Sequence, residues 1–229
     1  MLPQYTLTLA DPTAVAVEAA LLIGEAAHQA IAQRGVFRLV LAGGSTPQRT
    51  YQLLAATAQD WAKWEIFFGD ERCLPADHPE RNSLMAFEAW LARVAIPPAQ
   101  IHVIAAERGA SAAAADYAQL IASRRPFDLV LLGMGEDGHT ASLFPGAAAS
   151  DAAVIAVGDA PKPPAARVSL NYASLRDSHR QLVLVTGAGK AAALAAWQSG
   201  AADAADLPIA RAVHDDACLL VERAAMPAD

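Results

Sequence analysis

Short runs of apolar residues alternate along this chain with longer stretches in which apolar and polar positions are mixed. The runs Phe37–Ala42 and Phe127–Leu132 are apolar almost throughout, which is typical of strands buried on both faces of a parallel sheet. The stretches between such runs have the spacing of amphipathic helices. The pattern predicts further strands at 5–9, 64–68, 101–104, 167–170, 182–186 and 218–221, and helices at 12–34, 47–59, 83–94, 111–123 and 187–198.

Turn-forming residues mark the ends of several of these elements. Asp11 is suited to cap the first helix with Pro12 at its first position, and Gly35 is suited to end it. Residues 146–166 are rich in alanine, glycine and proline, which indicates an excursion over the surface. Weaker patterns suggest a strand at 154–157, a helical turn at 173–177 and an irregular or extended segment at 207–213.

Strands that alternate with helices of about 10–15 residues indicate an α/β fold. We predict one domain over residues 1–229, with an open, mostly parallel, Rossmann-like sheet covered by helices on both faces. Right-handed crossovers place the loops that follow the strands along one edge of such a sheet. That edge would bring together residues 43–46, 70–72, 137–139 and 187–190.

Composition and charge argue against several classes of function. The chain is 54% hydrophobic and 18% charged, which is typical of a well-buried globular protein. A net charge of −7 argues against broad nucleic-acid binding. No uninterrupted apolar run approaches the ~18 residues that span a bilayer, and the N-terminus lacks the features of a signal peptide. Two distant cysteines fit a reducing compartment, so we predict a cytoplasmic protein that binds neither nucleic acid nor membrane.

The loop after the strand at 127–132 carries the clearest chemistry. Three glycines surround Asp137 and His139, so that backbone, acid and imidazole come close together. Gly133, Gly135 and Gly138 formally match a dinucleotide fingerprint, but Pro145 cuts short the helix that such a site requires. Asp137 and His139 are also a poor metal pair, because no further ligand cluster accompanies them. Proton transfer is the favoured role.

Two other glycine-rich loops begin helices. Gly43, Gly44, Ser45 and Thr46 offer close backbone approach, free N–H groups and hydroxyls, which suits a phosphate, although a tight turn capped by Thr46 explains them equally well. The loop 187–190 repeats this arrangement and adds Lys190, but alone it is better explained as a helix start with a solvated lysine. Arg72 and Arg167 are ambiguous by themselves, as either surface ion-pairing groups or anion ligands.

Taken together and in order, these loops resemble the 6-phosphogluconolactonase family. The motifs that carry the resemblance are Leu41–Pro47, Phe68–Arg72 with Asn82-Ser83, Leu132–Pro145, Arg167–Leu170, and Thr186-Gly187 with Lys190. They span nearly the whole chain, and the third motif is the specific one. The resemblance implies a sheet of the kind shared with glucosamine-6-phosphate deaminase and ribose-5-phosphate isomerase, and hydrolysis of 6-phospho-D-glucono-1,5-lactone in the oxidative pentose phosphate pathway.

The resemblance also assigns roles to residues. It implies His139 as general base, since an imidazole titrates near pH ~6.5, with Asp137 orienting it or stabilising its cation. The sugar phosphate would bind Ser45, Thr46, Arg72, Arg167 and Lys190, with Asp70 also in the site. The backbone at Gly43-Gly44 would serve the carbonyl oxygen. No cofactor or metal is implied, because the lactone is already activated. The implied partner is a small phosphorylated sugar lactone.

Two alternatives stay open at this stage. Sugar-phosphate deaminases share the Gly-Gly-Ser-Thr-Pro and Asp-Gly-His loops, but they end the latter segment in Asn-Glu-Pro, where this chain has Leu143-Phe144-Pro145. They also usually carry an aromatic residue where Arg72 stands. A sugar-phosphate sensor without catalysis is the second alternative, which the lack of a helix-turn-helix disfavours. The sequence leaves the oligomeric state open between a monomer and a small homo-oligomer.

Overall fold

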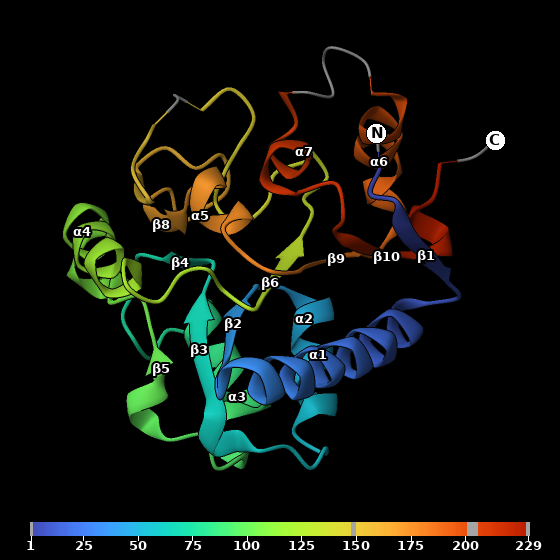
Figure 1. Cartoon of the computed structure of the whole chain (residues 1–229). Coiled ribbons are helices and arrows are strands. Elements are labelled where there is room, and N and C mark those ends of the chain that lie inside the picture. Colours follow the sequence, from blue (N-terminus) through green and yellow to red (C-terminus); the bar gives the residue numbers. More distant parts are fainter. Residues whose placement is uncertain (1, 148–149, 201–205, 228–229) are drawn as a thin grey trace.

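A seven-stranded parallel sheet forms the centre of the computed structural model, which describes residues 2–147, 150–200 and 206–227. Its strand order is β1-β10-β9-β6-β2-β3-β5, and every adjacent pair is parallel. The strands are β1 (Tyr5–Leu9), β2 (Phe37–Leu41), β3 (Trp64–Phe68), β5 (Ile101–His102), β6 (Leu129–Gly133), β9 (Gln181–Val185) and β10 (Cys218–Glu222). The predicted α/β fold with a mostly parallel sheet is confirmed (Figure 1).

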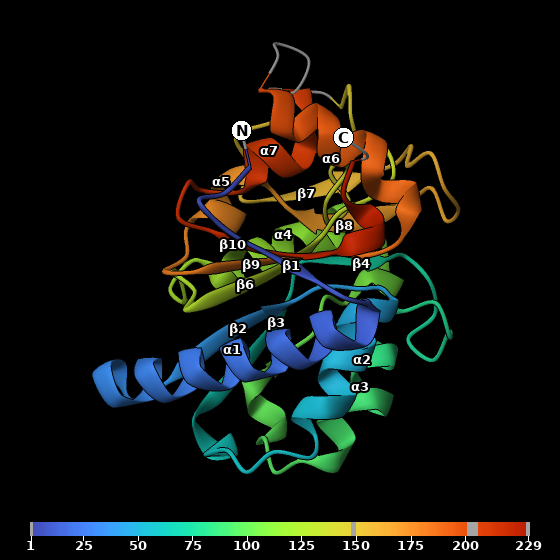
Figure 2. The same cartoon turned by 90° about the vertical axis from the view of Figure 1, so that its right-hand side faces the viewer.

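Helices cover both faces of this sheet, as predicted. Figure 2 shows one group on one face and a second group on the other. The first group is α1 (Pro12–Arg34), α2 (Ser45–Leu54) and α3 (Asn82–Ala89), and the second is α5 (Tyr172–Arg176), α6 (Ala191–Ser199) and α7 (Pro208–Ala212). Asp11 caps α1 through bonds from the Thr13 and Ala14 N–H groups, and Gly35 ends it in the left-handed conformation at φ 79°.

The order of the strands reverses between β2 and β6, which lie side by side. From β2 the chain moves outward through β3 to β5, and from β6 it moves the other way through β9 and β10. Loops that leave the carboxyl ends of the two central strands diverge at such a reversal, and open α/β sheets bind their ligands there. The reversal thus places the loops that follow β2 and β6 at opposite sides of one crevice.

A second, smaller sheet was not predicted. It consists of β4 (Asp70–Arg72), β8 (Arg167–Leu170) and β7 (Val154–Val157), all antiparallel, and α4 (Ala110–Ile121) packs against β7 and β8. Residues 70–72 were expected to be a loop. They are too few and too polar to show a strand pattern, and their pairing with β8 comes from a part of the chain that is distant in sequence.

Several predicted boundaries were wrong. The helix predicted to reach residue 59 ends at Leu54, because Ala56, Thr57 and Ala58 are exposed and have no apolar face to bury. The helix predicted for 83–94 breaks after Ala89 into a 3-10 turn, and the strand predicted for 101–104 has two residues. Residues 208–212, predicted as irregular or extended, form α7, which starts with Pro208 at its first position.

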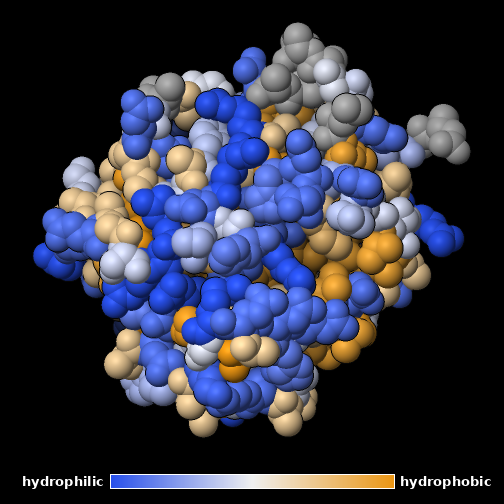
Figure 3. Space-filling model, in the orientation of Figure 1, coloured by the Kyte–Doolittle hydropathy of each residue, from blue (hydrophilic) through white to orange (hydrophobic). Residues whose placement is uncertain are grey.

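Helix α1 is long and apolar. By length and composition alone it could cross a membrane, since an 18-residue stretch of it has a mean hydropathy of 1.3. Half of that stretch is buried inside the fold. Its buried side, which includes Val15, Ala19 and Ile23, belongs to the main hydrophobic core. Its outer side exposes Val17 and Leu21, and hydrophobic residues gather where α1 and β1 lie, on the right of Figure 3. Packing of one side of α1 into the core therefore accounts for the apolar residues of that side.

Candidate functional site

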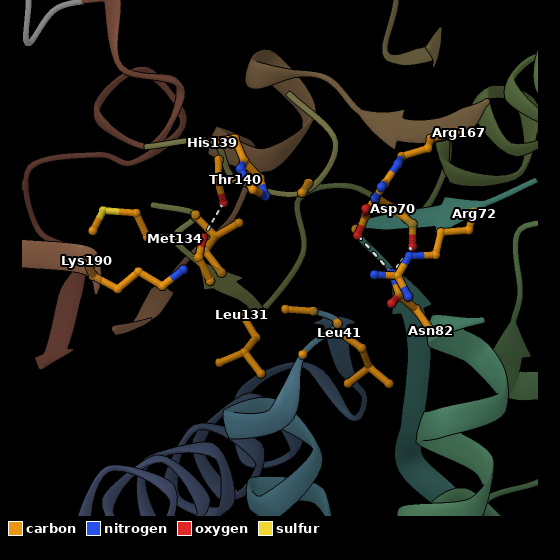
Figure 4. Close-up of a pocket in the computed structure, with 18 residues that line it drawn as sticks. Leu41, Asp70, Arg72, Asn82, Leu131, Met134, His139, Thr140, Arg167 and Lys190 are labelled. Atoms are coloured by element: carbon orange, nitrogen blue, oxygen red, sulfur yellow. Dashed lines mark hydrogen bonds between the residues drawn. The ribbon is translucent and has the colours of Figure 1, made fainter. Parts of the chain in front are cut away.

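A pocket of about 220 Å³ lies at the carboxyl edge of the parallel sheet. Its walls come from the loops after β2, β3, β6 and β9, together with β8 and the start of α3. The predicted convergence of the four loops is therefore present. The pocket-lining side chains that can bond or titrate are Asp70, Arg72, Asn82, His139, Thr140, Arg167 and Lys190 (Figure 4).

His139 and Asp137 form a hydrogen-bonded pair at this pocket. The imidazole Nδ1 lies 2.5 Å from Asp137 Oδ1, and the same oxygen accepts the backbone N–H of His139 at 3.2 Å. Burial opposes the negative charge of Asp137, but the bonds from the ring and the backbone N–H of His139 outweigh it, so the pKa of Asp137 is lower than its ordinary value. A carboxylate on Nδ1 fixes the proton there and leaves Nε2 as the basic nitrogen.

The loop that carries this pair is closed by its own hydrogen bonds. The Gly135 N–H donates to the His139 carbonyl at 2.7 Å, and the Gly138 N–H donates to the Gly135 carbonyl at 3.2 Å. The Thr140 hydroxyl donates to the Gly133 carbonyl at 2.8 Å. A Cβ on Gly135 would lie 2.0 Å from His139 Nδ1 and 2.6 Å from Asp137 Oδ1. Only glycine at this position leaves room for the paired side chains.

Phe144 packs against the imidazole of His139. The two ring centroids are 4.9 Å apart, and the phenyl ring is 8% exposed. This is the position where the deaminases that the sequence also resembles were expected to carry a glutamate. An apolar ring can hold the imidazole in place and exclude water, but it cannot transfer a proton.

Asp70 is a buried acid on the opposite wall. Its carboxylate accepts hydrogen bonds from the Ser142 hydroxyl at 2.6 Å and from the Asn82 amide at 3.1 Å. Burial raises its pKa, and neighbouring Glu71 raises it further, against the lowering effect of the Ser142 bond, Arg167 and Arg72. Asp70 lines the pocket and can therefore accept a hydrogen bond from a ligand there.

The neighbouring acid, Glu71, is structural. Its side chain is fully buried and accepts the N–H groups of Asn82 and Ser83, the first two residues of α3, each at 2.8 Å. It also pairs with buried Arg81 at 3.1 Å. Glu71 thus fixes the start of α3, which places Asn82 in the pocket wall.

Arg72 and Arg167 face each other across the antiparallel pair β4–β8, where they are register partners. Arg72 donates to the Glu80 carbonyl at 2.6 Å, and Arg167 donates to the carbonyls of Lys162 and Pro164 at 2.9 and 3.1 Å. Burial lowers the pKa of Arg167, and Arg72 adds to this, against the opposing effect of Asp70. Like charges directly opposite each other destabilise a strand pair, and an anion between them would relieve that repulsion.

Lys190 enters the pocket from the opposite side, after β9, as Figure 4 shows. Burial lowers the pKa of its ammonium group, with the charge of Glu136 opposing the shift. Within the described ranges, no residue forms a hydrogen bond or ion pair with its Nζ atom. An anionic ligand would therefore be its first close partner.

The loop after β2 contributes backbone more than side chains. Gly43 and Gly44 line the pocket, and a Cβ on Gly43 would lie 2.1 Å from Asn82 Oδ1. Ser45 is exposed at the first position of α2 and does not line the pocket. Thr46 is buried, and its hydroxyl shares a 2.6 Å hydrogen bond with the Thr186 hydroxyl. This loop can therefore offer N–H groups to a ligand, while the Thr46 hydroxyl already has a partner.

Three residues of the site, Asn82, Thr140 and Ser142, were not predicted as such, and Thr140, like Ser142, lies within the third motif. Asn82 belonged to a recognised motif but had no assigned role, and Ser142 had no signal beyond its place in the third motif. Asp137 lies behind the imidazole and does not line the pocket itself. Over the ranges that the structure describes, no three His, Cys, Asp or Glu side chains are grouped as a metal site would require.

Comparison with known proteins identifies the family. A family described as glucosamine-6-phosphate isomerases/6-phosphogluconolactonase matches residues 10–221, most of the chain. The chain belongs to this family. The resemblance stated from the sequence motifs is thereby confirmed.

Individual members of the family are similar to this chain in sequence and in structure. The 6-phosphogluconolactonase of Mycobacterium tuberculosis is 42% identical over 201 residues, which cover 80% of this chain and 81% of that protein. A solved 6-phosphogluconolactonase structure from Trypanosoma brucei has a TM-score of 0.87 at 27% identity and covers 98% of this chain and 97% of its own. A monomeric glucosamine-6-phosphate deaminase has a TM-score of 0.84 at 22% identity, covering 97% and 98%, which shows the shared fold alone.

Proposed function

We propose that this chain hydrolyses 6-phospho-D-glucono-1,5-lactone to 6-phospho-D-gluconate in the oxidative pentose phosphate pathway. The family match and the relatives named 6-phosphogluconolactonase support this activity. The His139–Asp137 pair at the pocket supplies the base that water attack on the lactone requires.

The reaction begins with a water held between His139 Nε2 and the lactone carbonyl carbon. Nε2 takes one proton as the water oxygen bonds to C1, and negative charge moves to the carbonyl oxygen. The bond between C1 and the ring oxygen then breaks, and the imidazolium returns its proton to that oxygen, which becomes the C5 hydroxyl. Asp137 holds the ring and stabilises its transient positive charge.

The phosphate end of the substrate fixes its position over His139. We assign its binding to Lys190, Arg72 and Arg167, three cations that line the pocket. The free N–H groups at the start of α2, next to pocket-lining Gly43 and Gly44, are candidate additional donors. Charge-assisted bonds at a distance from C1 turn a bimolecular attack into an oriented one. Asp70 would accept a sugar hydroxyl, and the backbone at Gly43-Gly44 would donate to the carbonyl oxygen as its charge develops.

The contact between Phe144 and His139 is the observation that favours a lactonase over a deaminase. A deaminase of this fold needs a proton relay beside its histidine, and this chain has a buried phenyl ring there. Hydrolysis of a lactone needs one base and one acid, which a single imidazole provides in turn. The arrangement therefore favours the lactonase.

A pH-stat assay with freshly generated phosphorylated lactone tests the proposal. The acid product releases a proton, and the spontaneous rate is subtracted. We expect His139→Ala to lose about 10²–10⁴ in kcat with little change in KM, since a positioned base supplies about that much. His28→Ala, on the exposed side of α1, is the matched control.

The competing functions give different outcomes in the same experiment. Ammonia release from glucosamine 6-phosphate would replace the lactonase proposal by a deaminase. Sugar-phosphate binding without turnover of either substrate would indicate a sensor. Near-normal kcat in His139→Ala would leave a lactonase with a different base.

We further propose that the chain acts as one domain, because the pocket takes side chains from both sheets. A cytoplasmic location and a monomer or small homo-oligomer remain predictions. Fractionation of cells and light scattering of the purified protein would test them.

A further inference from the structure

The short helix α7 packs against the loop that holds the catalytic pair, although none of its residues lines the pocket. Leu207, just before the helix, points at Gly138: a Cβ built on that glycine would lie 2.6 Å from Leu207 Cδ2. One residue into the helix, the Ile209 N–H donates to the Gly138 carbonyl at 3.0 Å. Gly138 stands between Asp137 and His139 in sequence, so these two contacts restrain the backbone that joins the two side chains.

The other end of α7 is anchored in the core. The Gln181 amide at the start of β9 donates to the Ala212 carbonyl at 2.9 Å, and Arg176 of α5 donates to the Val213 carbonyl. Arg211 lies over the Tyr172 ring, 4.2 Å from its centroid. Ile209 is fully buried. A helix fixed to β9 and α5 in this way can hold a neighbouring loop in one position.

The loop needs such a support on this side. Its own hydrogen bonds close it through Gly135 and Gly133, but Gly138 is in the left-handed conformation at φ 78°, a backbone state that other residues adopt only with strain. The carbonyl of Gly138 has α7 as its backbone partner. Without that contact the peptide between Asp137 and His139 would have more freedom to turn, and the 2.5 Å bond between the two side chains depends on it.

We propose that Leu207 and the Ile209 N–H are positioning groups for the His139–Asp137 pair: α7 presses on Gly138 and keeps the imidazole in the tautomer and direction that catalysis uses. The catalytic consequence rests on the proposed lactonase function. The geometric consequence, the state of the His139 ring, does not.

The test uses Leu207→Ala, with Leu22→Ala as a matched control. Leu22 is also partly buried against the core, but it lies on α1 away from the pocket. Imidazole ¹⁵N chemical shifts of the purified protein report which ring nitrogen carries the proton, and a lactone assay reports kcat and KM. We expect Leu207→Ala to change His139 from one tautomer to a mixture and to lower kcat roughly tenfold with KM little changed, less than the ~100-fold that a 1 Å misplacement costs. Leu22→Ala should change none of these.

Two further variants protect the test against simple loss of folding. Leu207→Met keeps the contact with Gly138 and should restore both the tautomer and kcat. Gly138→Ala brings a methyl group against Leu207, and truncation of Leu207 makes room for it, so the double variant Gly138→Ala/Leu207→Ala should lose less activity than the product of the two single losses. Circular dichroism confirms that each variant is folded.

The outcomes separate this inference from the proposed function. A tautomer change in Leu207→Ala supports the positioning role even if the wild-type protein does not hydrolyse the lactone. An unchanged tautomer together with an unchanged kcat in a lactone-hydrolysing protein would overturn it. Strictly multiplicative losses in the double variant would also overturn it, because they would show that Leu207 and Gly138 act independently.

Discussion

Two parts of the pocket, the loop with Asp137 and His139 and the group of three cations, are built in different ways. The loop with Asp137 and His139 is mostly local: apart from the bond that the Ile209 N–H of α7 donates to the Gly138 carbonyl, its hydrogen bonds join residues within the segment 133–143, and its acid and base are two positions apart. The cations of the pocket form a second group, assembled from β4, β8 and the turn after β9, which lie far apart in the chain, and Lys190 enters the pocket from the side opposite Arg72 and Arg167. Two of the cations bond to backbone carbonyls, and Lys190 has no such partner among the described residues.

The loop with Asp137 and His139 depends on exact geometry, whereas the cations act mainly through their charge. In the proposed function, the loop determines where a proton goes, and it tolerates almost no change of shape because its atoms are in close contact. In the same proposal the three cations hold the substrate's anionic end, and one of them can be lost while the others remain. Changes to the loop should therefore lower kcat strongly, and changes to the cations should mainly raise KM.

The largest effect is expected for Gly135→Ala. The added methyl group would overlap His139 Nδ1 and Asp137 Oδ1, so the pair cannot form as it stands. We expect a loss in kcat close to that of His139→Ala, about 10²–10⁴. Gly158→Ala is the control, since nothing lies within 4 Å of the Cβ it would add. Full activity of Gly135→Ala would show that the bond between His139 and Asp137 is dispensable.

A smaller effect is expected for Lys190→Ala. Removal of one charged bond to the phosphate should cost about 1.5–3 kcal/mol of substrate binding, or roughly 10–100-fold in kcat/KM, mainly through KM. The preference for phosphorylated over unphosphorylated lactone should fall by a similar factor. Lys63→Ala, which removes an exposed lysine paired with Asp60, is the control. An unchanged preference would remove Lys190 from the phosphate site.

Asp70 lies near Arg72 and Arg167, and its replacement measures how much a buried carboxylate lowers the free energy of unfolding. Its pKa is raised mainly by burial, so its folded-state carboxylate is unfavourable, and stability is lost as the pH rises through that pKa. Asp70→Asn removes the charge; its amide oxygen can still accept the Asn82 bond, and its NH2 group can donate to the Ser142 hydroxyl in place of accepting from it. We expect it to unfold a few degrees higher at pH 7, which corresponds to ~1 kcal/mol in a domain of this size, and to bind the lactone less tightly. A lower melting temperature would mean that Arg72 and Arg167 more than compensate for the burial.

The smallest effect is expected for Asp137→Asn, which should change how steeply the free energy of unfolding depends on pH. The pKa of Asp137 is lower in the folded protein, so its contribution is present above the unfolded-state pKa of about 3.9 and is lost as the pH falls through the folded-state pKa. Between about pH 5 and 3, Asp137→Asn should therefore lose stability less steeply than the wild type. Urea unfolding at a series of pH values measures this difference. Parallel curves would show that the bond to His139 does not favour the ionised carboxyl.

The parts of this protein that sequence predicts well are those governed by local rules. The buried strands β2 and β6, the capped helix α1 and the acid–imidazole loop follow from apolar runs, turn residues and spacing. The convergence of the four loops follows from the handedness of parallel crossovers. These features need no knowledge of distant contacts.

The parts that sequence misses depend on distant partners. Residues 70–72 become β4 only because β8 pairs with them, and α7 forms where a short buried segment packs against β9 and α5. The sequence gives no means of seeing that Arg167 holds the carbonyls of residues 162 and 164, or that the Thr46 hydroxyl bonds to Thr186. Local spacing therefore predicts the pairing of Asp137 with His139 better than the partners of the side chains around the pocket.

The pairing of β4 with β8 has a consequence for the order in which the protein is made. On the ribosome, Asp70 and Arg72 emerge long before Arg167, and the strand that braces them does not exist until then. Contacts between segments so far apart must close a long loop, so they form late in folding. Most hydrogen bonds of the loop with Asp137 and His139 can form from its own residues, whereas the β4–β8 wall with Arg72 and Arg167, like the support of the loop by α7, must await the last third of the chain.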